Sequence, residues 1–466
     1  MNLSLKVHPM PCCLFRCVLL ATLTAPVTQS TTQAAPPNIV FILADDLGYG
    51  DLSCFGQTTL KTPHLDRMAD EGLKLTRHYA GSTVCAPSRC VLLTGKHTGH
   101  ASVRGNGPAL LESGELTIAQ VLQKAGYATA CVGKWGVGNP PPLDDPNQRG
   151  FDHFYGYVSM WHAHNFYPEF LIRNGRKSPL RNVVPDKWKD GDGRGVATTR
   201  LDYAPHLIAN DAINFVKSHR DRPFFLYWAM NVPHANNEAR DQGMEVPDQF
   251  EFVTRDWPEP EKGFAAMIRN IDQDVGRMLD TLKSTGLDEN TLVVFTSDNG
   301  PHQEGGHKAD FFDSNGSLRG TKRDLYEGGI RVPAIARWPN HVPAGTVSDE
   351  ISGFQDWFPT FAELSGNDHQ AGLDGVSLVP ALTGKETNQK HHPFLYWEFQ
   401  EQGGKQAVLK GNWKAVRLNW AKQPDGPIEL YDLQTDPLET RNVVSDHPEI
   451  ANELTQAMAV SHTPQE

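Results

Sequence analysis

The chain has 466 residues, more than one hydrophobic core usually serves, so one large domain with a smaller appendage is expected. Its apolar and charged fractions, 39% and 21%, are those of a globular protein, and no repeat indicates a solenoid. The formal net charge of −12 argues against nucleic-acid binding, so an anionic substrate would need a local basic pocket.

Residues 1–35 have the pattern of a secretory signal peptide. Lys6 and Arg16 precede an apolar run at residues 17–25, and small residues lead to a predicted cleavage site between Ser30 and Ala35. The run is too short to span a bilayer, so we expect no membrane span and export to the periplasm or outside the cell. The alternative is an amphipathic N-terminal tail.

The first element of the expected large domain is a strand. Residues 38–44 form an unbroken apolar run, which is typical of a strand covered on both faces. Asp45 and Asp46 follow it, and adjacent carboxylates repel each other unless they are solvated or share a cation. Residues 62–73 then predict a helix with Thr62 as its N-cap.

A cysteine motif follows at residues 85–95. Pro87 suits a first helical turn, which places Cys85 at a helix N-terminus, where free amides and the helix dipole favour an anion. Arg89, one turn later, faces the same side. The alternative is that Cys85 is a buried hydrophobic residue or half of a disulfide with Cys90. Two cysteines five positions apart at the start of a helix, however, have Cα atoms too distant to bridge. Four cysteines beyond residue 35 do not form a disulfide framework.

Predicted strands and helices alternate along the next part of the chain. Apolar runs at residues 127–132, 223–230 and 291–296 predict strands, and residues 116–125, 204–218 and 263–284 predict helices. This alternation predicts an α/β fold with a mixed or parallel sheet, whose ligands bind beyond the carboxyl ends of the strands. We therefore expect one sheet edge to gather the polar residues that follow the strands: Asp45, Asp46, Lys134, His234, Asp298 and Asn299.

The remaining chain predicts a loop and a second unit. Residues 300–312 form a polar, Gly-rich loop, and Lys322 lies in a cation-rich stretch where it can approach an anion. Composition shifts at residues 384–392, and short apolar runs with a terminal helix at 448–460 predict a small antiparallel sheet plus one helix. The predicted divisions are a signal peptide at 1–35, a catalytic domain at 36–385 and a C-terminal subdomain at 386–466.

The expected edge residues offer a ligand set for a cation. Asp45, Asp46, Asp298 and Asn299 provide only oxygen donors, which suit calcium or magnesium and disfavour zinc. Calcium is the expected ion for an exported protein, with magnesium as the alternative.

The run Cys85-Ala86-Pro87-Ser88-Arg89, with Thr94-Gly95 after it, resembles the C-x-P-S-R signature of the type I sulfatases of the alkaline-phosphatase superfamily. The resemblance extends over most of the chain after residue 35, through residues 133–135, 233–234, 298–300, 319–333 and 430–442. It implies an alkaline-phosphatase-like fold with a large mixed, mostly parallel sheet. It also implies that a maturation enzyme oxidises Cys85 to formylglycine, an aldehyde.

The resemblance further implies the roles of the site residues. The metal would be held by Asp45, Asp46, Asp298, Asn299 and the modified Cys85, while Arg89, Lys134 and Lys322 would hold the sulfate oxygens and the aldehyde hydrate. One hydrate hydroxyl would attack sulfur, with Asp298 as the candidate base, and His234 would protonate the leaving alcohol.

One position departs from the family pattern. Many relatives have a histidine after Gly-Lys-Trp, and here that residue is Gly136. His302 or His307 would take its role in expelling sulfate, or the metal and Lys134 would act alone.

Two stretches rich in aromatic residues and histidine, 151–157 and 162–168, predict either ordinary loop packing or a sugar subsite. The candidate substrate-binding residues are His162, His164, Asn165 and His302.

The sequence therefore predicts an exported sulfatase that acts on a sulfated carbohydrate or an aryl sulfate. The first alternative is a formylglycine-dependent phosphonate monoester or phosphodiester hydrolase. The second is a non-catalytic glycan-binding protein in which Cys85 stays a thiol. The sugar, the position of its sulfate and the oligomeric state are left open by the sequence.

Overall fold

The computed structural model describes residues 1–11, 36–107, 110–138, 145–189, 191–367 and 372–464. It contains two compact units, Met1–Ala35 and Pro36–Glu466. Residues 1–11 have no regular secondary structure, and the predicted apolar run and cleavage site of the signal peptide lie outside the described residues. Within the described residues, no helix combines the length and apolar character that crossing a membrane requires.

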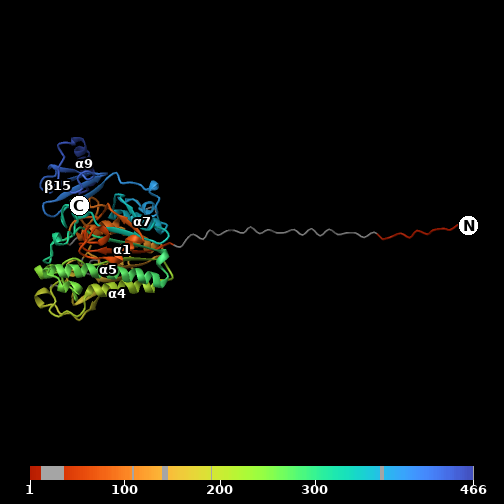
Figure 1. The fold of residues 1–466 in the computed structure, drawn as a ribbon, viewed down its shortest axis with the longest axis horizontal. Coiled ribbons are helices and arrows are strands. Elements are labelled where there is room, and N and C mark those ends of the chain that lie inside the picture. Colours follow the sequence, from red (N-terminus) through yellow and green to blue (C-terminus); the bar gives the residue numbers. More distant parts are fainter. Residues whose placement is uncertain (12–35, 108–109, 139–144, 190, 368–371, 465–466) are drawn as a thin grey trace. The chain divides into compact units, whose positions relative to one another are not determined.

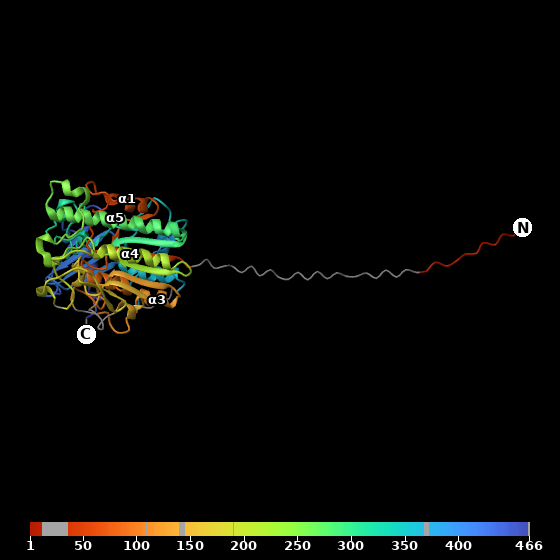
Figure 2. The same cartoon turned by 90° about the horizontal axis from the view of Figure 1, so that it is seen from below.

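A ten-stranded mixed sheet lies at the centre of the unit Pro36–Glu466 (Figures 1 and 2). Its strand order is β11-β2-β10-β9-β1-β8-β4-β5-β6-β7. The strands are β1 (Asn38–Ala44), β2 (Leu73–Leu75), β4 (Ala128–Lys134), β5 (His153–Tyr157), β6 (Phe170–Arg173), β7 (Arg176–Pro179), β8 (Phe224–Ala229), β9 (Thr291–Ser297), β10 (Ala334–Arg337) and β11 (Thr346–Ser348). A separate two-stranded sheet pairs β3 (His78–Tyr79) with β12 (Ser352–Gly353).

The middle of the sheet is parallel, from β9 through β1, β8 and β4 to β5. On one side β10 pairs antiparallel with β9 and β2, and β11 pairs parallel with β2; on the other side β6 pairs antiparallel with β5 and β7. In β1, Val40 and Ile42 pack into one hydrophobic core, while Phe41 and Leu43 pack into the other. Burial on both faces explains why the central strands have unbroken apolar sequences. The predicted mixed, mostly parallel sheet is confirmed.

Helices cover both faces of this sheet. One core contains residues of α1 (Pro63–Asp70), α4 (Ala204–Ser218) and α5 (Glu259–Thr285), and the opposite core contains α2 (Cys85–Thr94), α3 (Ile118–Lys124) and α7 (Trp357–Leu364). Figure 2 shows α1, α5 and α4 side by side over one face. Two short helices, α6 (Glu327–Ile330) and α8 (Val379–Leu382), complete this part of the chain.

The C-terminal part is a four-stranded antiparallel sheet with one helix, as predicted. The strands β13 (Leu395–Phe399), β14 (Lys405–Lys410), β15 (Trp413–Leu418) and β16 (Ile428–Asp432) are adjacent in that order, and α9 (Pro448–Ser461) packs on one face. The other face packs against residues near α6. There, the buried Lys414 Nζ lies 2.9 Å from Glu327 Oε1 and 3.0 Å from Glu439 Oε1. The domain boundary at residue 385 stays a prediction.

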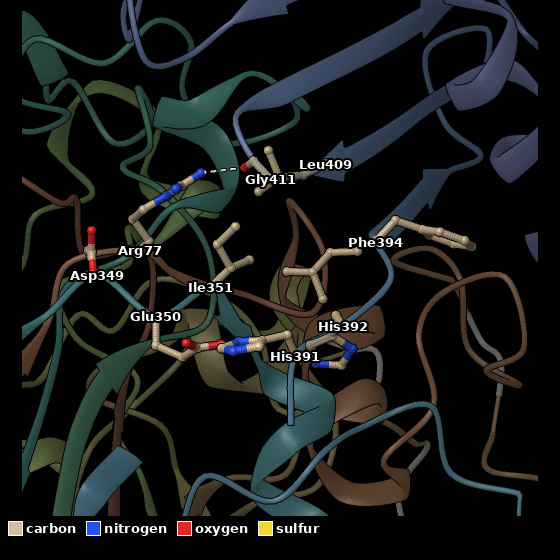
Figure 3. Close-up of a pocket in the computed structure, with 10 residues that line it drawn as sticks. Arg77, Asp349, Glu350, Ile351, His391, His392, Phe394, Leu409 and Gly411 are labelled. Atoms are coloured by element: carbon tan, nitrogen blue, oxygen red, sulfur yellow. Dashed lines mark hydrogen bonds and ion pairs between the residues drawn. The ribbon is translucent and has the colours of Figure 1, made fainter. Parts of the chain in front are cut away.

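A cavity of about 300 Å³ lies where the C-terminal sheet meets the larger part (Figure 3). Arg77 donates to the Gly411 carbonyl at 2.7 Å, and His391 Nδ1 lies 2.9 Å from Glu350 Oε1. Because these side chains are paired with each other, we assign them to the contact between the two parts.

Thr62 is the N-cap residue of α1, as predicted, but its side chain does not bond the first-turn amides. Its Oγ1 accepts from the Ser53 N–H at 2.9 Å and donates to Asp66 Oδ1 at 3.4 Å. The carboxylate of Asp272, on α5, accepts the His64 and Leu65 N–H groups at 2.9 Å each. The first-turn amides are therefore satisfied by a residue distant in sequence and not by the Thr62 side chain.

Asp272→Ala is expected to lower the free energy of unfolding by about 1 kcal/mol, since it removes the acceptor of two helix-terminal amides. The matched control is Asp280→Ala on the same helix, whose exposed ion pair with Arg67 contributes at most about 0.5 kcal/mol. Urea denaturation measures both. Equal effects would contradict the capping role.

Candidate functional site

Buried charges gather where β1, β4 and β9 end. Asp45 and Asp46 follow β1, Lys134 is the last residue of β4, and Asp298 and Asn299 follow β9. His234 and Lys322 reach the same place from loops, and the side chains of this group are almost inaccessible to solvent. The structure thus brings together the polar residues that sequence reasoning placed at one sheet edge.

Each carboxylate at this edge has a basic partner. Lys134 Nζ lies 2.7 Å from Asp45 Oδ2, and Lys322 Nζ lies 2.7 Å from Asp46 Oδ2. Burial raises the pKa of Asp45, but the charges of Lys134 and Arg89 outweigh it and hold the pKa well below its usual range. The pair of aspartates is therefore ionised inside the protein.

Arg89 joins three of these strand ends. Its Nε and Nη2 donate to Asp298 Oδ2 at 3.0 and 2.7 Å, and its Nη1 donates to the Lys134 carbonyl at 2.7 Å. Nη2 also lies 3.4 Å from Asp45 Oδ1. The guanidinium is fully buried, so its fork of donors is satisfied by protein alone.

Cys85 is the first residue of α2 and points at the aspartates. Its Sγ lies 3.3 Å from Asp45 Oδ1 and 4.0 Å from Asp46 Oδ1. Burial, followed by the charge of Asp45, raises the pKa of the thiol well above its usual value. The four described cysteines are free, so Cys85 and Cys90 form no disulfide.

The buried side chains at this edge fit a divalent cation. Asp45, Asp46, Cys85 and His234 each offer a ligand atom within 4.8 Å of the others. Asn299 Nδ2 donates to Asp46 Oδ1 at 2.7 Å, while the buried Asn299 Oδ1 has no hydrogen-bond partner among the described residues. A buried acceptor without a partner is costly, and a cation held by carboxylates satisfies it.

His234 is fixed in one tautomer. Its Nδ1 donates to the Ala235 carbonyl at 2.7 Å, so Nε2 is the unprotonated nitrogen, and it accepts from Lys322 Nζ at 3.2 Å. Burial and then the charge of Lys322 lower the pKa of His234 to about 3. The imidazole is therefore neutral, with Nε2 turned toward the site.

Glu304 is a charged group of the site that sequence reasoning missed. Its carboxylate lies 3.3 Å from Lys322 Nζ and 2.6 Å from Arg323 Nη1. It belongs to the polar loop at residues 300–312, where no motif distinguishes one acid from another.

A cavity of about 220 Å³ opens above these charges. It is lined by Cys85, Asn106, Lys134, Met160, Trp161, His164, His234, Asn237, Lys322, Arg323 and Glu401. Arg89 does not line it, although the family resemblance implies that this residue holds a sulfate oxygen. Glu401 comes from the connection between β13 and β14 and accepts the Asn106 N–H at 2.8 Å, so the C-terminal sheet contributes to the cavity wall.

Only one of the four predicted substrate-binding residues, His164, lines this cavity, and its ring stacks on His234 with centroids 4.9 Å apart. His162 lines a neighbouring cavity. Asn165 is buried, with Oδ1 accepting from the Tyr167 N–H, and His302 Nε2 lies 3.0 Å from the Pro233 carbonyl. Backbone contacts therefore occupy the last two side chains.

Gly136 lies against Arg89. Its φ of +76° is left-handed, and a Cβ there would lie 3.1 Å from Arg89 Cδ. His302 and His307, the candidates to replace a histidine at position 136, do not line the cavity. His307 Nδ1 lies 2.6 Å from Glu261 Oε2, and His302 is bound to the Pro233 carbonyl.

Comparisons with known proteins agree along the chain. A family model described as Sulfatase matches residues 37–367, and a model described as N-sulphoglucosamine sulphohydrolase, C-terminal, matches residues 320–463. The chain is 31% identical to N-acetylgalactosamine-6-O-sulfatase of Bacteroides thetaiotaomicron, covering 91% of this chain and 92% of that protein. It is 32% identical to arylsulfatase A of Bos taurus, covering 94% and 89%.

Solved structures show the same fold. The structure of Ps i-CgsB with k-i-k-neocarrahexaose has a TM-score of 0.76 and 27% identity, covering 91% of this chain and 92% of that one. The phosphonate monoester hydrolase of Agrobacterium radiobacter has a TM-score of 0.61 and 20% identity, covering 91% and 95%, which is a likeness of fold alone.

Arg89→Met is expected to lower the free energy of unfolding by about 3–5 kcal/mol, because Asp298 then stays buried without its cation. Arg323→Met, which breaks the half-exposed pair with Glu304, is the control and is expected to cost no more than about 1 kcal/mol. Denaturant titration of both variants measures the difference. A small loss for Arg89→Met would show that other groups balance the carboxylates.

Proposed function

The chain belongs to the sulfatase family, and on that premise we propose that it cleaves a sulfate ester of a carbohydrate by means of formylglycine at position 85 and a bound calcium ion. The observation that carries this proposal is the setting of Cys85, which lines a cavity together with Lys134 and Lys322 and lies beside two ionised aspartates. A cavity with this charge pattern binds a tetrahedral anion next to residue 85.

The proposed modification of Cys85 requires a maturation enzyme as partner. A formylglycine hydrate supplies a hydroxyl as nucleophile, which a protonated thiol does not provide. The short apolar run near the N-terminus supports export, to the periplasm or outside the cell, as part of the same proposal.

We assign the sulfate oxygens to the two lysines. Lys134 and Lys322 both line the cavity, and each is held in place by a carboxylate at 2.7 Å. Arg89 acts through Lys134 and Asp298, since it donates to the Lys134 carbonyl and to the Asp298 carboxylate. It is a positioning residue in this proposal.

His234 is the proposed proton donor to the leaving alcohol. Because the neutral ring keeps its proton on Nδ1, against the Ala235 carbonyl, Nε2 first takes a proton from the Lys322 ammonium 3.2 Å away and then gives it to the leaving oxygen, which leaves Lys322 as a neutral amine. The stack of His164 on His234 keeps the ring in this orientation.

Calcium would be held by Asp45, Asp46, Asp298, Asn299 and residue 85, and it would stabilise negative charge and lower the pKa of a bound hydroxyl. The all-oxygen set and the unpartnered Asn299 Oδ1 support this ion. Calcium tolerates irregular coordination better than magnesium does.

N-acetylgalactosamine 6-sulfate is the first substrate that we propose to test. The relatives named N-acetylgalactosamine-6-sulfatase, from bacteria and mammals, are 30–32% identical to this chain. Trp161, His164 and Asn237 add an aromatic face and polar edges to the cavity, which suit a sugar ring.

The tryptic peptide at residues 78–89, from protein made in a host with a maturation enzyme, is expected to carry an aldehyde in place of the thiol, as measured by mass spectrometry. Cys85→Ala is expected to lower the kcat for N-acetylgalactosamine 6-sulfate by at least about 10⁴-fold, since it removes the nucleophile. Cys90→Ala, on the same helix, is the control and retains turnover. Faster cleavage of a phosphodiester than of the sulfate ester with the same 4-nitrophenol leaving group would overturn the choice of reaction.

Calcium is expected to raise the Tm of chelator-treated protein, and to raise it more than magnesium does. At 100 times its Kd, calcium is expected to add about 2.7 kcal/mol to the free energy of unfolding. Asp46→Asn is expected to abolish the increase, whereas Asp280→Asn, which changes an exposed carboxylate, retains it. Differential scanning calorimetry measures the shift without reference to activity. A larger shift with magnesium would replace calcium by that ion.

A further inference from the structure

The N-terminus of α2, which carries Cys85, is held by a residue outside the helix. Cys85 is the first residue of α2, and its N-cap residue, Val84, makes no side-chain hydrogen bond to the first turn. The Ala86 N–H donates instead to Asn106 Oδ1 at 3.0 Å. The first amides of a helix have no acceptor within the helix, so an external acceptor of this kind keeps the first turn in place.

Asn106 depends on a further contact for its own position. It lies between Gly105 and Gly107, and a Cβ at Gly107 would have no described atom within 4 Å. The Asn106 N–H donates to Glu401 Oε1 at 2.8 Å, and a Cβ at Gly105 would lie 3.4 Å from the same oxygen. A hydrogen bond to an ionised carboxylate is stronger than one between neutral groups, so Glu401 fixes the backbone on which Asn106 stands.

Glu401 belongs to a connection that is well braced. It lies between β13 and β14, and the Gly404 N–H donates to the Glu401 carbonyl at 3.0 Å. The Trp420 N–H donates to the Gly404 carbonyl at 3.0 Å, which ties the connection to the chain after β15. Lys405 Nζ donates to the Arg323 carbonyl at 2.6 Å, so the connection also contacts the opposite wall of the catalytic cavity.

Two hydrogen bonds therefore join the C-terminal sheet to the catalytic residue, from Glu401 to Asn106 and from Asn106 to Ala86. Ala86 is bonded directly to Cys85, whose Sγ lies 3.3 Å from Asp45 Oδ1. Because reacting groups must be held close to one geometry, a displacement of about 1 Å at a nucleophile can cost up to about 100-fold in rate. Fraying of the first turn of α2 would produce such a displacement.

We propose that Glu401 is a positioning residue for the reaction, which acts through Asn106 to hold residue 85 against Asp45 and Asp46. The C-terminal sheet thereby takes part in catalysis without supplying a reacting group. This inference rests on the proposed function, since it assigns the nucleophile to residue 85.

Kinetics with N-acetylgalactosamine 6-sulfate test the proposal. Glu401→Ala and Asn106→Ala are each expected to lower kcat about tenfold, with KM within a factor of two of the wild type, because each leaves the first turn of α2 unsupported. Glu401→Gln keeps a carbonyl acceptor and is expected to retain kcat within about threefold. Gln402→Ala is the matched control, because Gln402 follows Glu401 in the same connection but is exposed and does not line the cavity.

The double variant Glu401→Ala with Asn106→Ala shows whether the two residues act in series. It is expected to be no slower than Asn106→Ala alone, since the contact that Glu401 supports is already lost. Glu401 also lines the cavity, so a direct contact with the substrate is the rival explanation. Losses that multiply in the double variant, or a KM that rises in Glu401→Gln, would establish that rival and overturn the proposal.

Hydrogen–deuterium exchange of the Ala86 amide separates this inference from the proposed function. Relative to the amides of β4, it is expected to exchange at least about fivefold faster in Glu401→Ala and within a factor of two of the wild type in Glu401→Gln and Gln402→Ala. This result supports the positioning role even if no sulfate ester is cleaved and Cys85 stays a thiol. An unchanged rate in Glu401→Ala overturns it.

Discussion

Arg89 donates two hydrogen bonds to Asp298 and a third to the end of β4, in a place that water does not reach. Without a guanidinium there, three carboxylates at one sheet edge would repel each other in a medium of low dielectric constant. Arg89, Lys134 and Lys322 balance them, and each cation comes from a different element. The position of α2, and with it of Cys85, depends on this balance.

The same balance explains the need for a cation. Asp45 and Asp46 have lysine partners, but Asn299 Oδ1 remains unpaired and the thiol of Cys85 faces the two carboxylates. A divalent ion held by these oxygens would complete the pairing of buried polar groups. Binding, catalysis and stability would then share one set of contacts, so that loss of the ion weakens the fold as well as the reaction.

Much of this site could be predicted because strands buried on both faces have a clear sequence pattern, and parallel strands end at a common edge. Asp45, Lys134 and Asp298 were found in this way. The pattern is weaker elsewhere, and the sequence predicts neither β5 nor β14 as a strand. Glu304, Arg323 and Glu401 could not be found either, because loops and a distant sheet place them, and no periodicity marks such residues.

The sequence also does not predict how the side chains near the site are oriented. His302 lies next to the site in sequence, but its ring is held by the Pro233 carbonyl, and His307 pairs with Glu261. Sequence spacing does not show which way a side chain points. Gly136 illustrates the consequence, since a Cβ at this position would press on Arg89. A residue that assists the expulsion of sulfate at position 136 would have to share its space with the guanidinium. In this chain position 136 supplies no side chain for the expulsion of sulfate, so an assisting group would come from the residues that line the cavity.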